Sequence, residues 1–220
     1  MKISIDEIKH NHKVRIYIER ADESLSALGY TEHSFAHVSL VADRAKEILA
    51  TMGYPERECE LAEIAGYLHD IGNVVNRVEH AQSGAVMAFR ILDEMGFDAD
   101  EVSTIVTAIG NHDESTAFPV NPVAAALILA DKTDVRRTRV RIKDQQKFDI
   151  HDRVNYAVGR SSVKINDEKT EIALRIEIDT SLCSVTDYFE IFIDRMILCR
   201  KAAEKLGLKF VLRINGQKLM

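Results

Sequence analysis

The sequence predicts a mainly α-helical protein, a helical bundle that carries a small C-terminal β-β-α-β appendage. Three observations support this fold class. Apolar residues recur every three or four positions as far as residue 135, which is the spacing of helices that pack against a core. Only three prolines and ten glycines interrupt the 220 residues. Beyond Asp149 the apolar residues alternate with polar ones, which is typical of a strand with one buried face.

Five helices are expected in the segment from residue 34 to residue 135. The first, over residues 34–52, ends at Gly53-Tyr54-Pro55, because glycine and proline together stop a helix. The last, over residues 123–135, is apolar on every side over residues 123–130, so it should lie at the centre of the bundle. The first thirty residues should add one or two further helices. The remaining expected helices cover residues 56–69, 82–95 and 100–111, the last of these capped by Asp98 or Asp100.

We expect residues 1–146 to form the helical domain and residues 147–220 to form the appendage. A strand is predicted over residues 170–179, where four apolar residues alternate, with residues 163–165 as its hairpin partner. The appendage is completed by a helix over residues 186–206 and a last strand over residues 208–214. Because no Gly/Ser-rich linker separates the two parts, they should pack together.

Composition and charge exclude several classes of protein. The 29 basic and 35 acidic residues give a net charge of −6, which argues against a surface that binds nucleic acid. The longest apolar run, residues 123–130, is far shorter than the roughly 20 residues of a membrane-spanning helix. The N-terminus lacks the charge order of a signal peptide, and the three cysteines lack CxxC spacing. These features predict a cytoplasmic protein with cysteines in its core.

Six histidine and aspartate side chains lie at predicted helix ends or on apolar helix faces. A carboxylate such as Asp131, which directly follows the apolar run, is costly to bury without a partner, and a cation would supply one. Mixed imidazole and carboxylate ligands suit iron, manganese, zinc, cobalt or nickel better than calcium. The candidate ligands are His37, His69, Asp70, His80, His112 and Asp131.

The spacing of these residues suggests two divalent transition-metal ions that share one aspartate. Six side chains leave several coordination positions of two ions open for water and substrate, which is typical of a catalytic site. Two such ions and two aspartates leave a local charge of about +2, which should attract phosphate. The expected ligands are His37, His69, Asp70 and Asp131 for the first ion, and Asp70, His80 and His112 for the second.

At these residues the sequence resembles the HD-domain superfamily of metal-dependent phosphohydrolases. The resemblance spans residues 33–135, and its ordered set of segments is far more specific than a lone His-Asp pair. It implies an HD-type helical bundle and the hydrolysis of a phosphate ester, often of a nucleotide, by metal-activated hydroxide. The matching segments are His37, Leu68-His69-Asp70-Ile71-Gly72-Asn73, His80, Asn111-His112-Asp113-Glu114 and Ala130-Asp131-Lys132.

One residue departs from this resemblance, because many HD hydrolases have lysine where this chain has Asn73. Asparagine can donate a hydrogen bond to a phosphate but cannot neutralise it. We expect catalytic roles for Asp70, Asn73 and Lys132, with Lys132, Arg77 or the basic run of residues 136–143 supplying the missing positive charge. Because Asn73 differs from the usual lysine, a di-iron oxygenase of the same superfamily is an alternative function. A non-catalytic nucleotide-sensing module is a second alternative.

The sequence therefore predicts a metal-dependent phosphohydrolase that acts on a small phosphorylated molecule, with nucleotides among the candidates. We expect no membrane or nucleic-acid partner and leave a homodimer open. His33 precedes His37 by four residues and is expected on the same helical face, within reach of the site. If residues 136–143 do not contact the substrate, they should form a solvated arm.

Overall fold

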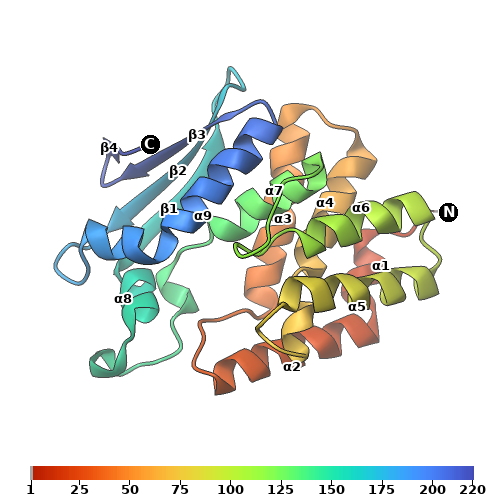
Figure 1. Ribbon diagram of the computed structural model, residues 1–220, viewed down its shortest axis with the longest axis horizontal. Coiled ribbons are helices and arrows are strands. Elements are labelled where there is room, and N and C mark those ends of the chain that lie inside the picture. Colours follow the sequence, from red (N-terminus) through yellow and green to blue (C-terminus); the bar gives the residue numbers. More distant parts are fainter. Residues whose placement is uncertain (1) are drawn as a thin grey trace.

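The computed structural model describes residues 2–220 and confirms the predicted fold class, with a helical bundle and a small C-terminal sheet (Figure 1). The last helix of the bundle lies at its centre, since every side chain from Val123 to Lys132 is buried. The helices of the bundle are α1 (Ile5–His10), α2 (His12–Ala27), α3 (Phe35–Met52), α4 (Glu56–Leu68), α5 (His80–Met95), α6 (Ala99–Gly110) and α7 (Pro122–Lys132).

The helix ends follow from local capping. The side chain of Asn11 accepts hydrogen bonds from two backbone N–H groups of α2, so it separates α1 from α2. Asp98 caps α6 in the same way. The predicted bounds of α5 and α7 differ from the observed ones: α5 begins at His80, and α7 ends at Lys132, where the Thr133 hydroxyl donates to the Leu129 carbonyl (2.5 Å).

The 3₁₀-helix η1 (Ile71–Val74) connects α4 to the loop before α5 and lies directly against α5. Gly72 makes this contact. A Cβ atom at Gly72 would lie 2.0 Å from the carbonyl oxygen of His80 and 2.4 Å from the backbone nitrogen of Gly84. Only glycine allows the two backbones to approach this closely, and the approach places Asp70 beside His80.

Replacing Gly72 with alanine is expected to lower the free energy of unfolding by about 3 kcal/mol, because neither backbone can move aside without disturbing η1 or α5. Urea denaturation measures this change. Gly110→Ala is the matched control, since its Cβ would lie at an ordinary 3.6 Å from the Cβ of Ala85. A Gly72→Ala protein as stable as Gly110→Ala would contradict the close packing of η1 against α5.

The C-terminal part is a four-stranded sheet with two helices. Strands β1 and β2 pair antiparallel, β2 and β3 pair parallel, and β3 and β4 pair antiparallel, in the order β1-β2-β3-β4. The predicted β-β-α-β order is present, with an additional helix before it and a short strand after it. The elements are α8 (Ile150–Ala157), β1 (Val158–Ile165), β2 (Glu171–Ile178), α9 (Val185–Lys205), β3 (Lys209–Ile214) and β4 (Gln217–Lys218).

Helix α9 joins the sheet to the bundle. It lies between the strands and α7 (Figure 1), and its buried residues share one hydrophobic core with both. The three cysteines, Cys59, Cys183 and Cys199, are free and buried in this core, as the sequence predicts. Within residues 2–220, no helix is both long and apolar enough to cross a membrane.

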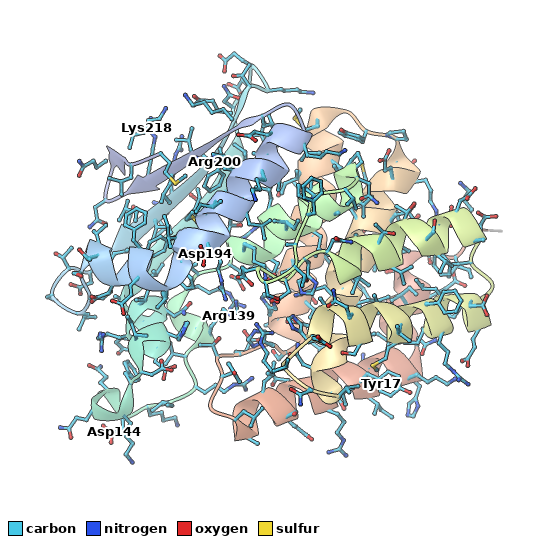
Figure 2. The ribbon with its side chains drawn as sticks, in the orientation of Figure 1. Tyr17, Arg139, Asp144, Asp194, Arg200 and Lys218 are labelled. Carbon is cyan, nitrogen blue, oxygen red and sulfur yellow. The ribbon has the colours of Figure 1, made fainter. Side chains whose placement is uncertain are left out.

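The prediction of a solvated arm over residues 136–143 is wrong. Arg136 lies 3.1 Å from a carboxylate oxygen of Glu32, and Arg139 donates to the backbone carbonyl of the same residue (3.0 Å). Arg141 pairs with the carboxylate of Asp22. The arginines therefore fasten this segment to the end of α2 and to the loop before α3, and Figure 2 shows Arg139 where the bundle meets the appendage. Their acidic partners lie more than a hundred residues away in the sequence, as the separations of 104, 107 and 119 show.

Candidate metal centre and its cavity

The structure brings all six candidate ligands together at one place in the bundle, and each is at most 9% exposed. They come from the ends of five different helices. The first turn of α3 carries His37, the end of α4 carries His69 and Asp70, α5 begins with His80, α6 is followed by His112, and the last turn of α7 carries Asp131.

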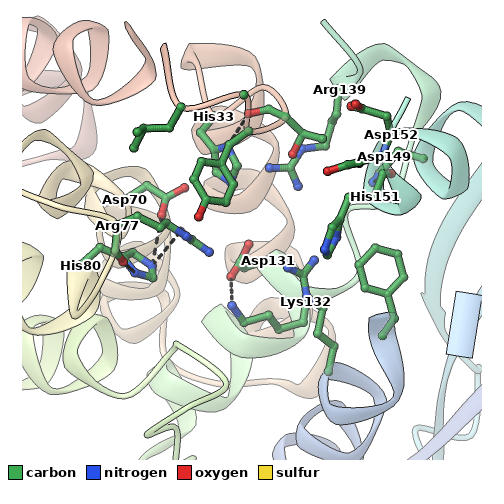
Figure 3. A pocket seen from close by; sticks show the side chains of 17 residues that line it. His33, Asp70, Arg77, His80, Asp131, Lys132, Arg139, Asp149, His151 and Asp152 are labelled. Carbon is green, nitrogen blue, oxygen red and sulfur yellow. Dashed lines mark hydrogen bonds and ion pairs between the residues drawn. The ribbon is translucent and has the colours of Figure 1, made fainter. Parts of the chain in front are cut away.

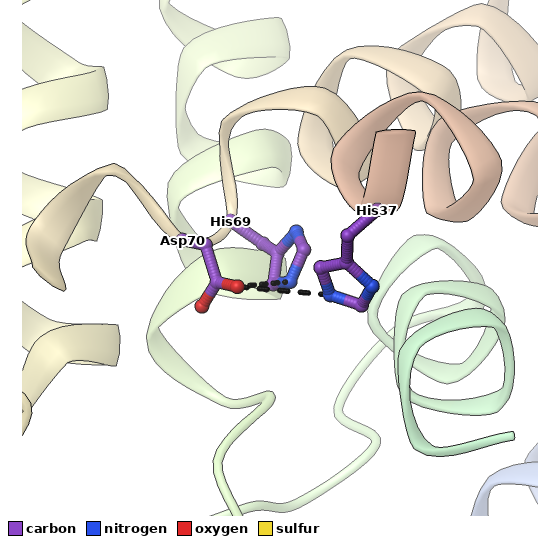
Figure 4. Close-up of side chains that lie close together, drawn as sticks. All are labelled: His37, His69 and Asp70. Carbon is purple, nitrogen blue, oxygen red and sulfur yellow. Dashed lines mark ion pairs between the residues drawn. The ribbon is translucent and has the colours of Figure 1, made fainter. Parts of the chain in front are cut away.

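Two histidines and two aspartates, His37, His69, Asp70 and Asp131, form a first group, and Figure 4 shows the first three of them. The Nε2 atom of His37 lies 3.6 Å from Oδ2 of Asp70 and 3.4 Å from Oδ1 of Asp131. The Nε2 atom of His69 lies 3.3 Å and 3.8 Å from the same two oxygens. The two imidazoles and two carboxylates therefore converge on a single point.

A second group lies on the other side of Asp70. The Nε2 atom of His80 lies 3.6 Å from Oδ1 of Asp70 and 3.2 Å from Nε2 of His112. The two oxygens of Asp70 thus face different groups, Oδ2 toward His37 and His69 and Oδ1 toward His80. A carboxylate in this position can bridge two metal ions.

The orientation of each histidine is fixed by its other ring nitrogen. Every Nδ1 atom lies within hydrogen-bond distance of a carbonyl or carboxylate oxygen, so it carries the proton and donates. Each Nε2 atom then has a lone pair that points to the centre of the site. The acceptors are Asp134 for His37 (2.8 Å), Gly66 for His69 (2.8 Å), Arg77 for His80 (3.0 Å) and Ile109 for His112 (2.6 Å).

The donor set fits a divalent cation. Nε2 of His37, Nε2 of His69 and Oδ2 of Asp70 are buried and have no hydrogen-bond partner among residues 2–220. Leaving three such atoms unpaired is costly, and a cation would satisfy all of them. Burial lowers the pKa of His80 and holds that of His112 well below its usual range, so both imidazoles are neutral and free to bind a metal.

Asp134 is a functional residue that the sequence analysis missed. Its Oδ2 accepts the hydrogen bond from Nδ1 of His37 (2.8 Å), and its charge is balanced by Arg136 (2.9 Å) and Arg139 (3.7 Å). Burial would raise the pKa of Asp134, but the hydrogen bond from His37 and the two arginines hold it far below its usual value. A carboxylate in this position orients the imidazole and increases its basicity as a ligand.

Replacing Asp134 with asparagine is expected to weaken metal binding about 10- to 100-fold, because the amide keeps the shape of the side chain but loses the charge behind His37. Competition with a metal-binding dye measures this affinity. Asp93→Asn, at an exposed position on α5, is the matched control. Equal affinities of the two variants would show that Asp134 does not support the site.

The two other residues with expected catalytic roles occupy different positions. Lys132 is buried, lines the cavity above the site, and lies 2.8 Å from Oδ2 of Asp131 and 3.1 Å from Oε2 of Glu114. Asn73, expected to contact a phosphate, is not among the residues that line this cavity. Its Nδ2 donates to the backbone carbonyl (2.9 Å) and to Oδ1 (2.8 Å) of Asp70, so it orients that carboxylate from behind.

A cavity of about 370 Å³ opens over the candidate ligands (Figure 3). Asp70, His80 and Asp131 lie at its inner end. His33 also lines it, with its ring centroid 5.4 Å from that of His37. The expectation that both histidines share a helical face is wrong, because α3 begins at Phe35, after the N-cap Ser34.

Part of the chain is similar to known proteins. Residues 34–136 match the family described as the HD domain. An uncharacterized protein of Methanocaldococcus jannaschii is 27% identical over 213 residues, which cover 86% of this chain and 80% of that protein. A crystal structure of a predicted HD superfamily hydrolase from an uncultured Thermotogales bacterium is 26% identical, with a TM-score of 0.46, over 58% of this chain and 69% of its own.

Proposed function

Because residues 34–136 are an HD domain, we propose that the chain is a metal-dependent phosphohydrolase that cleaves a small phosphate ester. The observation that carries this proposal is the set of buried, unpaired ligand atoms beside a cavity. His37, His69, Asp70 and Asp131 would hold one ion, and Asp70, His80 and His112 would hold a second. Divalent ions in such a site lower the pKa of bound water and neutralise negative charge on a phosphate.

The residues of the chain itself supply the rest of the chemistry. Arg77 lines the cavity and has no carboxylate partner within residues 2–220, so its charge is available to a phosphate group. Lys132 already has two carboxylate partners, which makes it a poorer anion ligand and a better anchor for Asp131. In this arrangement Arg77 replaces the lysine that many HD hydrolases have at the position of Asn73.

The experiment is a screen of nucleoside monophosphates and sugar phosphates with the protein loaded with manganese, cobalt or nickel in the absence of oxygen. Release of inorganic phosphate supports the hydrolase. Asp131→Ala is the negative control, because it removes a ligand of the first group. Binding of a nucleotide without any turnover would instead support a non-catalytic sensing module.

The second candidate is a di-iron oxygenase. The observation that favours it is the buried amide of Asn73, which provides no positive charge for a phosphate. The same substrates are therefore incubated with the iron-loaded protein in air. Turnover under these conditions alone, with O₂ consumed in proportion to product, would contradict the hydrolase and support the oxygenase.

A further inference from the structure

The cavity over the metal centre extends beyond the HD domain. Its inner end is formed by ligands from the bundle, and its opposite wall is formed by α8 and α9 of the appendage (Figure 3). Asp152 and Asn155 of α8 lie in this wall. A molecule that fills this cavity would therefore contact two different parts of the chain, with the appendage at the end remote from the metal centre.

Asp152 is unusual among the buried acids of this protein. Glu63 lies 2.7 Å from Nζ of Lys46, and Asp134 lies 2.8 Å from Nδ1 of His37. Asp152 as a residue is only 4% exposed, and its side chain, which lines the cavity, accepts no hydrogen bond and forms no ion pair across residues 2–220. Burial and the nearby carboxylate of Asp149 raise its pKa. An acceptor that lines a cavity without a partner is available to a ligand.

Asn155 provides a second acceptor on the same face of α8, since it follows Asp152 by three residues. The residue is 5% exposed, and its Nδ2 donates to the backbone carbonyl of His151 (2.9 Å). The Oδ1 atom accepts no hydrogen bond from the described residues. The remote wall of the cavity therefore presents two acceptors, and it favours a ligand that brings hydrogen-bond donors.

The two arginines near this wall of the cavity, Arg139 and Arg195, do not satisfy these acceptors. Arg139 donates to the backbone carbonyls of Glu32 (3.0 Å) and Asp134 (3.1 Å). Arg195 of α9 stacks on the ring of Phe192, 4.7 Å from its centroid, and its Nε lies 2.5 Å from Oε1 of Glu114. Its charge is thus directed to the bundle. The cavity is consequently polarised, with Arg77 and the metal ligands at one end and unpaired acceptors at the other.

We propose that Asp152 and Asn155 form a second subsite, which accepts hydrogen bonds from hydroxyl or amino groups of the substrate at the end remote from its phosphate. Only the placement of the phosphate rests on the proposed function. The substrate class is then a phosphate ester of a polyhydroxylated or amino-bearing molecule, such as a sugar phosphate or a nucleotide. A simple alkyl phosphate lacks the donors that this wall of the cavity would bind.

The test compares three phosphate esters with the metal-loaded protein: ribose 5-phosphate, 5-aminopentyl phosphate and pentyl phosphate. For wild type, we expect at least one of the first two to have a higher kcat/KM than pentyl phosphate, and the preferred one identifies the donor as hydroxyl or amino. Asp152→Asn should lower kcat/KM for the preferred ester about 10- to 100-fold, as expected for a lost charged hydrogen bond, and change that for pentyl phosphate less than about two-fold.

Two further variants complete the test. Asn155→Ala should lower the preference for the donor-bearing ester over pentyl phosphate, because it removes the second acceptor while alanine keeps α8 helical. If Asp152→Asn does not fold, Asn155→Ala takes its place in the test. Asp144→Asn removes an exposed carboxylate outside the cavity and should leave the preference unchanged. Equal losses for all three esters, or a wild-type protein without preference, would overturn the subsite.

Failure of the proposed function gives a different result. If the wild-type protein hydrolyses none of the esters with any metal, the phosphohydrolase is wrong, and calorimetric titration with the same three compounds tests the subsite alone. Tighter binding of ribose 5-phosphate or 5-aminopentyl phosphate that is lost in Asp152→Asn supports it. Indifference of binding to the remote group overturns it.

Discussion

Replacing Asp70 with alanine is expected to remove both metal ions and to lower phosphate release by about three orders of magnitude or more. The reason is geometric, because Oδ2 of Asp70 faces His37 and His69 while Oδ1 faces His80. Asp131, the other carboxylate of the site, faces His37 and His69 through Oδ1 and pairs with Lys132 through Oδ2. Elemental analysis of protein purified without chelator measures the loss directly, and wild type should hold close to two ions.

Asp113→Ala is the control for this experiment. Asp113 follows His112 directly and accepts a hydrogen bond from Ser115, but it belongs to none of the clusters that could hold a metal. It should therefore retain both ions. An Asp70→Ala protein that keeps one full ion would show that this carboxylate does not bridge, and a wild-type protein without metal would contradict the enzyme as a whole.

The candidate ligands could be predicted from the sequence because each has a local signature. Asp131 ends an apolar run that only a central helix explains, and the pair His69-Asp70 lies between apolar segments at a helix end. The spacing of apolar residues also predicts that these helices share one core, which brings their ends together. Local patterns are thus sufficient where a residue is costly to bury without a ligand.

Residues that act through distant partners could not be predicted in this way. Asp134 contacts His37 across 97 positions of the chain, and Arg141 contacts Asp22 across 119. Such pairs leave no periodic pattern in the sequence. The basic residues 136–143 were therefore predicted to be solvated, although the structure shows them paired with acidic residues of the bundle. Asn73 was mispredicted for a different reason. Its position in the motif suggests a contact with phosphate, whereas in the structure its amide donates a hydrogen bond to the Asp70 carboxylate.

The appendage shows the same limit for secondary structure. Helix α8 is only eight residues long, so its apolar side chains at helical spacing, Ile150, Val154 and Ala157, are too few to predict a helix from the sequence. Its polar residues Asp152 and Asn155 are buried because they line the cavity and not because they pack in the core. Strand β1 was only partly predicted, since its burial does not alternate along the strand at this edge of the sheet.

Replacing His80 with alanine is expected to remove one metal ion and keep the other. His80 belongs to a single cluster of ligand atoms, with Asp70 and His112, whereas His112 also lies close to His69 and Asp131. The first group keeps all of its ligands in this variant. Because the second ion supplies part of the charge that stabilises the transition state, phosphate release should fall about 100-fold or more. Elemental analysis together with kinetics measures both effects.

The comparison of His80→Ala with Asp131→Ala decides whether the two groups are separate sites. Asp131 faces His37 and His69, so its loss should empty the first site, and the two variants should differ in the affinity of the ion that remains. Gln82→Ala controls for changes at the start of α5, because its side chain donates to Gly110 on the outside of the bundle. If His80→Ala and Asp131→Ala both lose the same single ion, the ligands form one site, and Asp70 acts there as an ordinary ligand without a bridging role.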